Sequence, residues 1–218
     1  MVAVSMGKDR ADLQPLLDNH RLWTELVAGG QQLVLIGEDL GGIDLSGVDL
    51  NGAVLSEVRL DGAKLTDADL YFTFAGSASL VAADLHGAHL AKAEFPGAVG
   101  REANFSDANL MRSEWWEADL RGANFDRTTL TKTSFARADL RGCSFRGARF
   151  DRTSFYDATL GDLDAAGASG TILPGPASIE TSDGLHGANQ DEVLAYLRAA
   201  GADVSFWVPP TAPGRSRP

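Results

Sequence analysis

Apolar residues recur along this chain with a period of five. Leu or Phe occupies 22 of the 25 positions that are multiples of five between Leu40 and Leu160. The residue two positions earlier is Ala in 15 of these 25 repeats and Val, Thr, Ser or Cys in eight more. Asp and Asn are numerous directly before the Leu or Phe. We therefore treat residues 40–160 as an array of five-residue repeats.

This period fits neither an α-helix nor a flat strand. Five helical residues turn through about 500°, so a column of Leu would spread around the axis. In a flat strand an odd period would place successive Leu residues on opposite faces. The two apolar positions of one repeat do face the same way in an extended segment. The chain must therefore turn a corner in every repeat, often at a Gly two residues after the Leu, which predicts a polygonal β-solenoid.

The repeats also carry a family resemblance. The sequences IDLSG, VDLNG, ADLHG, ANFSD, ADLRG and ANFDR resemble the A(D/N)LXX repeat of the pentapeptide-repeat family, over about 125 of the 218 residues. The resemblance implies an all-β solenoid, a right-handed quadrilateral β-helix in which four repeats, or 20 residues, make one coil. About six coils follow, and at about 4.8 Å per coil the rod is roughly 30 Å long.

Residues 20 apart should then lie in one column. Two columns would be aromatic inside the rod, one with Phe95, Phe135 and Phe155 and one with Phe105, Phe125 and Phe145. Two columns would be basic outside it, one with Arg101, Arg121 and Arg141 and one with Arg112, Lys132 and Arg152.

Two adjacent tryptophans fall at different positions of the repeat. Trp115 occupies a central position, in the column of Leu55, Ala75 and Phe95, so we expect it in the core. Trp116 occupies the next position, which points outward. An exposed Trp can be incidental, but Trp is enriched where proteins bind one another.

The chain divides into four expected segments. These are an N-terminal tail and capping helix (1–30), the β-helix (31–165), a C-terminal loop, helix and strand (166–208) and a disordered tail (209–218). In the first segment, residues 12–28 are expected to form a helix with one apolar face, which Gly29–Gly30 ends. The residues on that face are Leu13, Leu16, Leu17, His20, Trp23 and Val27. A helix carrying HRLW before the repeats resembles many bacterial family members.

The C-terminal segment begins where the five-residue pattern decays, after Leu160. Asn189, followed three residues later by Glu192, predicts a helix to about Ala200 that Gly201 ends. VSFWV at 204–208 predicts a short strand. The segment either caps the last coil or forms a homodimer contact, as the C-terminal segments of gyrase-modulating relatives imply; the candidate dimer residues are Leu194, Leu197, Phe206 and Trp207.

The charge of the chain limits the classes of molecule that we expect it to bind. The net charge of −11 and the pI near 4.7 argue against coating nucleic acid or a membrane surface and favour a basic protein surface. Residues 38–100 hold ten carboxylates and three bases, whereas residues 101–152 hold ten bases and eight carboxylates. A single cysteine, and the lack of a signal-like N-terminus or long apolar run, favour a cytoplasmic location.

Nothing in the sequence assembles a catalytic group. His86 and His89 lie near each other without a Cys or a clear carboxylate partner, so we interpret them as solvated imidazoles. Cys143 occupies a small-residue position, where a thiol substitutes for Ala or Thr. We therefore predict a non-enzymatic protein with no metal and no cofactor.

The first functional hypothesis is a non-catalytic protein-binding rod with an interaction, regulatory or self-protection role. Its evidence is a set of outward aromatic residues and Met on an otherwise polar surface. The candidate interface residues are Tyr71, Phe72, Phe74, Met111, Trp116 and Tyr156.

The alternative is mimicry of duplex DNA. Quinolone-resistance proteins of this family resemble B-DNA in width and charge and bind DNA gyrase, a type II topoisomerase, in its place. The resemblance implies that the acidic half could meet a DNA-binding saddle, and that this would inhibit the enzyme or protect it from quinolones or toxins. The candidate residues are Asp39, Asp44, Asp49, Asp61, Asp67, Asp69, Asp84 and Glu94. The basic columns count against this hypothesis.

Overall fold

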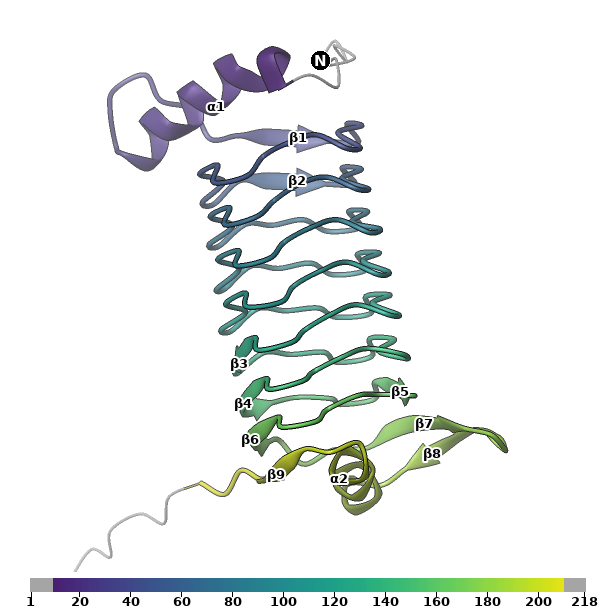
Figure 1. The fold of residues 1–218 in the computed structure, drawn as a ribbon. Helices are drawn as coiled ribbons and strands as arrows, with labels where there is room; N and C mark the ends of the chain where they lie inside the picture. The colour runs from purple at the N-terminus through teal and green to yellow at the C-terminus, as the bar shows by residue number, and fades with distance from the viewer. Residues whose placement is uncertain (1–9, 210–218) are drawn as a thin grey trace, which may run out of the picture.

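The computed structural model describes residues 10–209, which form a helix, a long β-solenoid and a C-terminal cap (Figure 1). The elements in chain order are α1 (Arg10–Thr24), β1 (Val34–Ile36), β2 (Val54–Ser56), β3 (Thr129–Thr131), β4 (Arg149–Thr153), β5 (Thr159–Gly161), β6 (Ser169–Ile172), β7 (Ala177–Thr181), β8 (Gly184–Ala188), α2 (Gln190–Ala199) and β9 (Asp203–Phe206). The disordered tail expected at 209–218 falls outside the described residues except for Pro209.

The solenoid has the predicted 20-residue coil. Parallel pairs join residues 20 apart, from Val34 with Val54 to Ser144 with Asp164. The stack makes about seven turns rather than the expected six, because the repeat does not end at Leu160. Ala165 and Ala168 are still buried, and β6 pairs with β4 below the last regular coil. The right-handed sense stays a prediction.

The two predicted aromatic columns are confirmed inside the rod. Phe105, Phe125 and Phe145 stack with ring centroids 4.9 and 5.1 Å apart. In the other column, Phe95 stacks on Trp115 at 4.4 Å. Rings of the two columns meet edge to face, the geometry that the charge distribution of an aromatic ring favours.

The small-residue position accepts polar residues because the backbone supplies an acceptor there. Thr133 and Thr153 each donate a hydrogen bond to the carbonyl oxygen 23 residues earlier, at 2.7 and 2.6 Å. The thiol of Cys143 points at the equivalent oxygen, that of Leu120, at 3.0 Å. Each of these buried groups therefore has a partner, as burial requires.

The (D/N) position of the repeat has a structural role. The side chain of Asp49 accepts the N–H of Asn51, and that of Asn124 accepts the N–H of Asp126, both at 2.9 Å. Asx side chains often stabilise turns in this way. Two residues after each central position, from Gly37 to Gly167, the backbone is left-handed even where the residue is not Gly, as at Phe72 (φ 55°).

Helix α1 covers the open end of the first coil, as predicted. It buries Leu13, Leu17 and His20, and Nδ1 of His20 accepts the N–H of Leu33 at 3.0 Å. The helix is shorter than expected. It ends at Thr24, so Val27 is exposed and lies off the predicted face.

The C-terminal segment closes the other end. The predicted helix is confirmed as α2, with both hydrogen bonds of the capping box between Asn189 and Glu192. The predicted strand is confirmed as β9, which pairs in parallel with β6 and extends the solenoid by one rung (Figure 1). Leu197 is buried and Phe206 packs against the core, so both serve the cap. The homodimer contact stays a prediction.

One element was missed by the sequence analysis. Residues read as an irregular loop form an antiparallel hairpin of β7 and β8, with Thr181 paired to Gly184. The run of turn-forming residues Ser182, Asp183 and Gly184 was its sequence signal.

Candidate protein-binding surface

One side of the rod exposes a strip of apolar residues. We call it the aromatic side; its outward column contains Val34, Val54, Phe74, Glu94 and Glu114, and the corners beside it carry Ile36, Phe72 and Trp116. Ile36 and Phe72 are each 61% exposed, and Trp116 is 45% exposed. Large exposed apolar residues gathered on one face are typical of interaction sites.

An open groove lies along one corner of the aromatic side. Phe74, Gly76, Pro96 and Trp116 line it, with Ser56, Ser77 and Gly97, and Glu57 and Glu117 complete the lining. Its volume is about 420 Å³. We call it the aromatic groove. It exists because the corner column between Ile36 and Trp116 contains only Ser56, Gly76 and Pro96, which leave space between the larger side chains.

The electrostatics of this side are acidic. Partial desolvation raises the pKa of the Glu114 carboxyl, and the neighbouring Glu94 carboxylate adds to the rise while a hydrogen bond with Ser134 opposes it. At the corner, Arg137 forms an ion pair with Glu117 at 3.0 Å, and its guanidinium lies 5.5 Å from the ring centroid of Trp116.

The structure groups only some of the predicted interface residues. Phe72, Phe74 and Trp116 come together on the aromatic side, whereas Tyr156 lies two coils beyond Trp116. Tyr71 is partly used inside the molecule, because it stacks on His89 at 5.6 Å and accepts a hydrogen bond from Lys92 at 2.6 Å. Met111 shares its column and is 36% exposed. Val34, Ile36 and Pro96 were missed, although the 20-residue period aligns them with Phe74 and Trp116.

Comparison with known proteins decides the family. Residues 39–73, 78–114, 116–147 and 133–169 match the model of pentapeptide repeats, in eight copies, and these segments cover more than half of the chain. The chain belongs to the pentapeptide-repeat family.

Several solved structures resemble parts of this chain. QnrB1, a plasmid-mediated fluoroquinolone resistance protein, is 17% identical, with a TM-score of 0.32 over 63% of this chain and 89% of its own. HetL, a pentapeptide repeat protein involved in heterocyst differentiation regulation in the cyanobacterium Nostoc sp. strain PCC 7120, is 24% identical, with a TM-score of 0.36 over 68% of this chain and 89% of its own. Rfr23 from the cyanobacterium Cyanothece 51142 is 26% identical, with a TM-score of 0.31 over 57% and 90%. None of the curated protein sequences matches this chain.

The eight acidic residues proposed for DNA mimicry do not form one face of this pentapeptide-repeat protein. The 20-residue register distributes them over all four sides of the rod. Asp39, Asp44, Asp49, Asp69 and Asp84 each accept a backbone N–H two residues later. Much of the acidic charge therefore belongs to the architecture of the repeat and encircles the N-terminal half.

The first basic column is interleaved with carboxylates. Asp119 binds Arg101 at 2.6 Å and Arg121 at 2.8 Å, and Asp139 binds Arg141 at 2.6 Å. The hydrogen bond from Arg121, supported by Arg101, holds the pKa of Asp119 far below its ordinary value. In the second column, Arg152 binds Asp151 at 2.9 Å. The positive charge that the sequence indicated is thus largely compensated locally.

His86 and His89 have carboxylate neighbours, contrary to the sequence interpretation. Nδ1 of His89 lies 3.1 Å from Oδ1 of Asp69, and Nδ1 of His86 lies 3.5 Å from Oδ2 of Asp107. The coil brings each carboxylate beside its histidine from 20 or 21 residues away, which a search along the sequence does not reveal. Within residues 10–209, no group of three His, Cys, Asp or Glu side chains could hold a metal ion.

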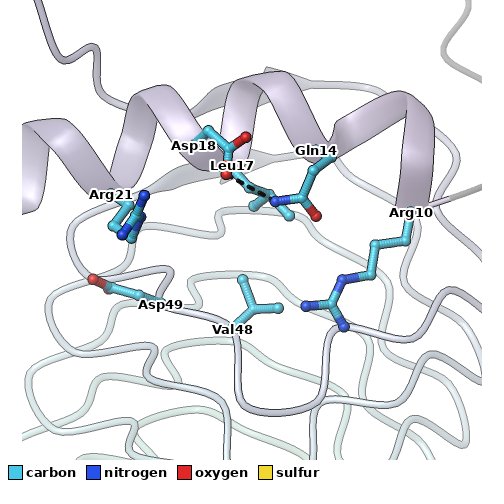
Figure 2. Close-up of a pocket in the computed structure, with 7 residues that line it drawn as sticks. All are labelled: Arg10, Gln14, Leu17, Asp18, Arg21, Val48 and Asp49. Carbon is cyan, nitrogen blue, oxygen red and sulfur yellow. Dashed lines mark hydrogen bonds between the residues drawn. The ribbon is translucent and has the colours of Figure 1, made fainter.

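Two further features carry no chemistry. Burial strongly raises the pKa of the Cys143 thiol, which disfavours the reactive thiolate. A space of about 170 Å³ between α1 and the first coils is lined by Arg10, Gln14, Leu17, Asp18, Arg21, Val48 and Asp49 (Figure 2). Its charged groups are of both signs, and Gln14 is hydrogen-bonded to Asp18, so we interpret it as the seam of the cap.

Among the described helices, none has the length and apolarity to cross a membrane.

Proposed function

We propose that this pentapeptide-repeat protein is a non-catalytic rod that binds a partner protein through its aromatic side. The observation that supports this proposal is the exposure of large apolar residues on one side of a rigid scaffold. These residues are Val34, Ile36, Phe72, Phe74 and Trp116. Aromatic residues are enriched at protein interfaces, and a preformed surface loses little entropy when it binds.

The test is a comparison of two double variants in a partner search. Wild type, Phe72→Ala/Trp116→Ala and the control Thr66→Ala/His86→Ala, which lies on another side, are used to retrieve binding proteins from cells of the source organism. We expect a specific protein that the wild type and the control retain and the aromatic variant loses. Equal retention by all three would refute the aromatic side as the binding surface.

DNA mimicry is the second candidate function, and one structural observation weakens the objection that the basic columns raised against it. The arginines of the first basic column are paired with Asp119, Asp139 and Glu180, so they repel a DNA-binding saddle less than their number suggests. A DNA gyrase supercoiling assay, at two salt concentrations and with and without a quinolone, tests it. Salt-sensitive inhibition or rescue from the drug supports mimicry, whereas no effect at tens of micromolar with enzymes from more than one bacterium removes it.

Charge reversal then tests the polarity of such a complex. If the acidic half meets the partner, reversal at Asp61, Asp67 and Asp69 should weaken binding more than reversal at Arg121 and Arg141. Equal effects, or the opposite order, would contradict that polarity.

A further inference from the structure

The aromatic groove has a shape and charge that suit one particular side chain. We propose that it binds an arginine side chain presented by a partner protein; this rests on the proposed protein-binding function and specifies the chemistry of the contact. Three observations support it, concerning the space in the groove, its charge and an arginine of the chain itself.

The floor of the groove is open because its residues are small. At Gly76 an added Cβ would lie 3.0 Å from Cζ of Phe74, so the ring of Phe74 leans over the place where a side chain would otherwise stand. Pro96 and Gly97 continue the floor towards Trp116. Phe74 and Trp116 stand two coils apart, or about 10 Å along the rod, which leaves room for a planar group with an aliphatic stem.

The charge of the groove selects a cation. Glu57 and Glu117 both line it, and Arg137, which lies at one end of the groove, pairs with Glu117. Glu94 and Glu114 add negative charge to the adjoining column. A carboxylate or phosphate ligand would be repelled, whereas a cation gains from the carboxylates and from the faces of the aromatic rings.

Arg137 shows which cation this environment accepts. Its guanidinium bonds Glu117 and lies against Trp116, so an aromatic ring and a carboxylate already hold a guanidinium at one end of the groove. A guanidinium is planar, stacks on aromatic rings and forms forked hydrogen bonds with carboxylates, whereas an ammonium does neither as well. The groove also contains a second aromatic ring and a second carboxylate, those of Phe74 and Glu57, on coils nearer the N-terminus.

The direct test is an NMR titration of the full chain with N-acetyl-arginine-N-methylamide. The matched probes are the citrulline analogue, which has nearly the same shape without the charge, and the lysine analogue. We expect the Trp116 indole N–H signal to shift with a Kd on the order of millimolar for one side chain. The lysine analogue should bind more weakly and the citrulline analogue should cause no shift.

Three variants identify the site. Trp116→Ala, followed through backbone signals of Gly76 and Gly97, should weaken binding about two- to fivefold. Gly76→Val should abolish it by filling the floor, whereas Ala136→Val, in the same corner column outside the groove, should not. Arg137→Gln removes the internal guanidinium and should strengthen binding.

Each contrary result has a definite meaning. Equal binding of the citrulline and arginine analogues, or unchanged binding by Gly76→Val, would overturn the proposed arginine site. If Phe72→Ala/Trp116→Ala loses the partner but the arginine probe fails to bind the wild type, the protein-binding function stands and the arginine inference falls. If the probe binds the wild type but Phe72→Ala/Trp116→Ala retains the partner, the groove accepts a guanidinium while the partner binds elsewhere, so the aromatic side is refuted as the binding surface and the contact with a partner's arginine is refuted with it.

Discussion

Trp115 and Trp116 are neighbours whose surroundings differ completely. The side chain of Trp115 is fully buried, stacks on Phe95 and meets Phe105 edge to face at 5.1 Å. Its Nε1–H, which burial would otherwise leave without a partner, donates to Oγ of Ser113 at 3.0 Å. The other two central positions without Leu or Phe hold small residues, Ala75 two coils away in this column and Gly100 on the adjacent side.

We predict effects of very different size on stability from removing the two indoles. Trp115→Ala should lower the free energy of unfolding by about 3–5 kcal/mol, because a large cavity opens between stacked coils. Trp116→Ala should change it by less than about 0.5 kcal/mol, as is usual for exposed sites. Urea denaturation followed by circular dichroism measures both. Similar losses would contradict the assignment of Trp116 to a binding surface.

His20 couples the N-terminal cap to pH. Its Nδ1 accepts the N–H of Leu33, so the buried ring is neutral with the proton on Nε2, which has no hydrogen-bond partner. Desolvation lowers the pKa of His20, although the Asp49 carboxylate and the backbone of Asn51 oppose the shift. Protonation would add a hydrogen to Nδ1 and break the bond from Leu33.

We therefore predict that acid loosens the cap. The folded state binds this proton less well than the unfolded state, so His20 contributes stability that is present above about pH 6.5 and is lost as the pH falls below it. Hydrogen exchange of the Leu33 amide, corrected for intrinsic rates, should show less protection at pH 5.5 than at pH 7.5. His20→Gln, which keeps an acceptor without a titrating group, should flatten the dependence; an unchanged dependence would place its origin elsewhere.

At the scale of elements, the end of α1 depends on a residue that is unsuited to its position. The N–H of Val27 donates a hydrogen bond to the carbonyl oxygen of Leu22 at 2.8 Å. The N–H of Leu26 donates one to the carbonyl oxygen of Trp23 at 3.1 Å. These are the two hydrogen bonds of a Schellman motif. Its left-handed position, normally Gly, is Leu26 with φ 57°, and Leu26 is 93% exposed.

Leu26→Gly should therefore stabilise the protein by about 1 kcal/mol, since it removes a strained side chain that makes little contact. Leu26→Ala is the matched control, because alanine keeps the Cβ that causes the strain and should leave stability nearly unchanged. Thermal unfolding of the three proteins compares them. An equal gain for both variants would attribute the effect to burial or solubility and not to the backbone.

These elements show what the sequence can predict and why the rest escapes it. The solenoid, its columns and the capping box at Asn189 depend on short-range patterns repeated many times, so single exceptions such as Gly100 do no harm. The end of α1 was misplaced because its turn uses Leu26, which no propensity favours, while Gly29–Gly30 suggested a later stop. Gly30 has another role: an added Cβ would lie 2.3 Å from the backbone nitrogen of Trp23. The aromatic side was only half recognised, since Val34 and Ile36 precede the regular repeats.

At the scale of the whole molecule, the rod must protect two open ends. A solenoid leaves unpaired N–H and C=O groups at its last coil, which can recruit another chain. Helix α1 covers one end. At the other, β9 pairs with β6 along its length, and Val204 of β9 is buried. This arrangement favours the capping role of the C-terminal segment over its use as a dimer contact.

Truncation separates these two roles. A chain ending after Ala202 lacks β9, so the edge of β6 is exposed and we expect concentration-dependent association by light scattering. A chain ending after Pro209 keeps β9 and should have the same oligomeric state as the full chain. If the full chain is instead a dimer and the shorter chain a stable monomer, β9 and its neighbours Leu194 and Trp207 form the dimer contact. The sign of the mass change on losing β9 thus distinguishes a strand that terminates the rod from one that joins two rods.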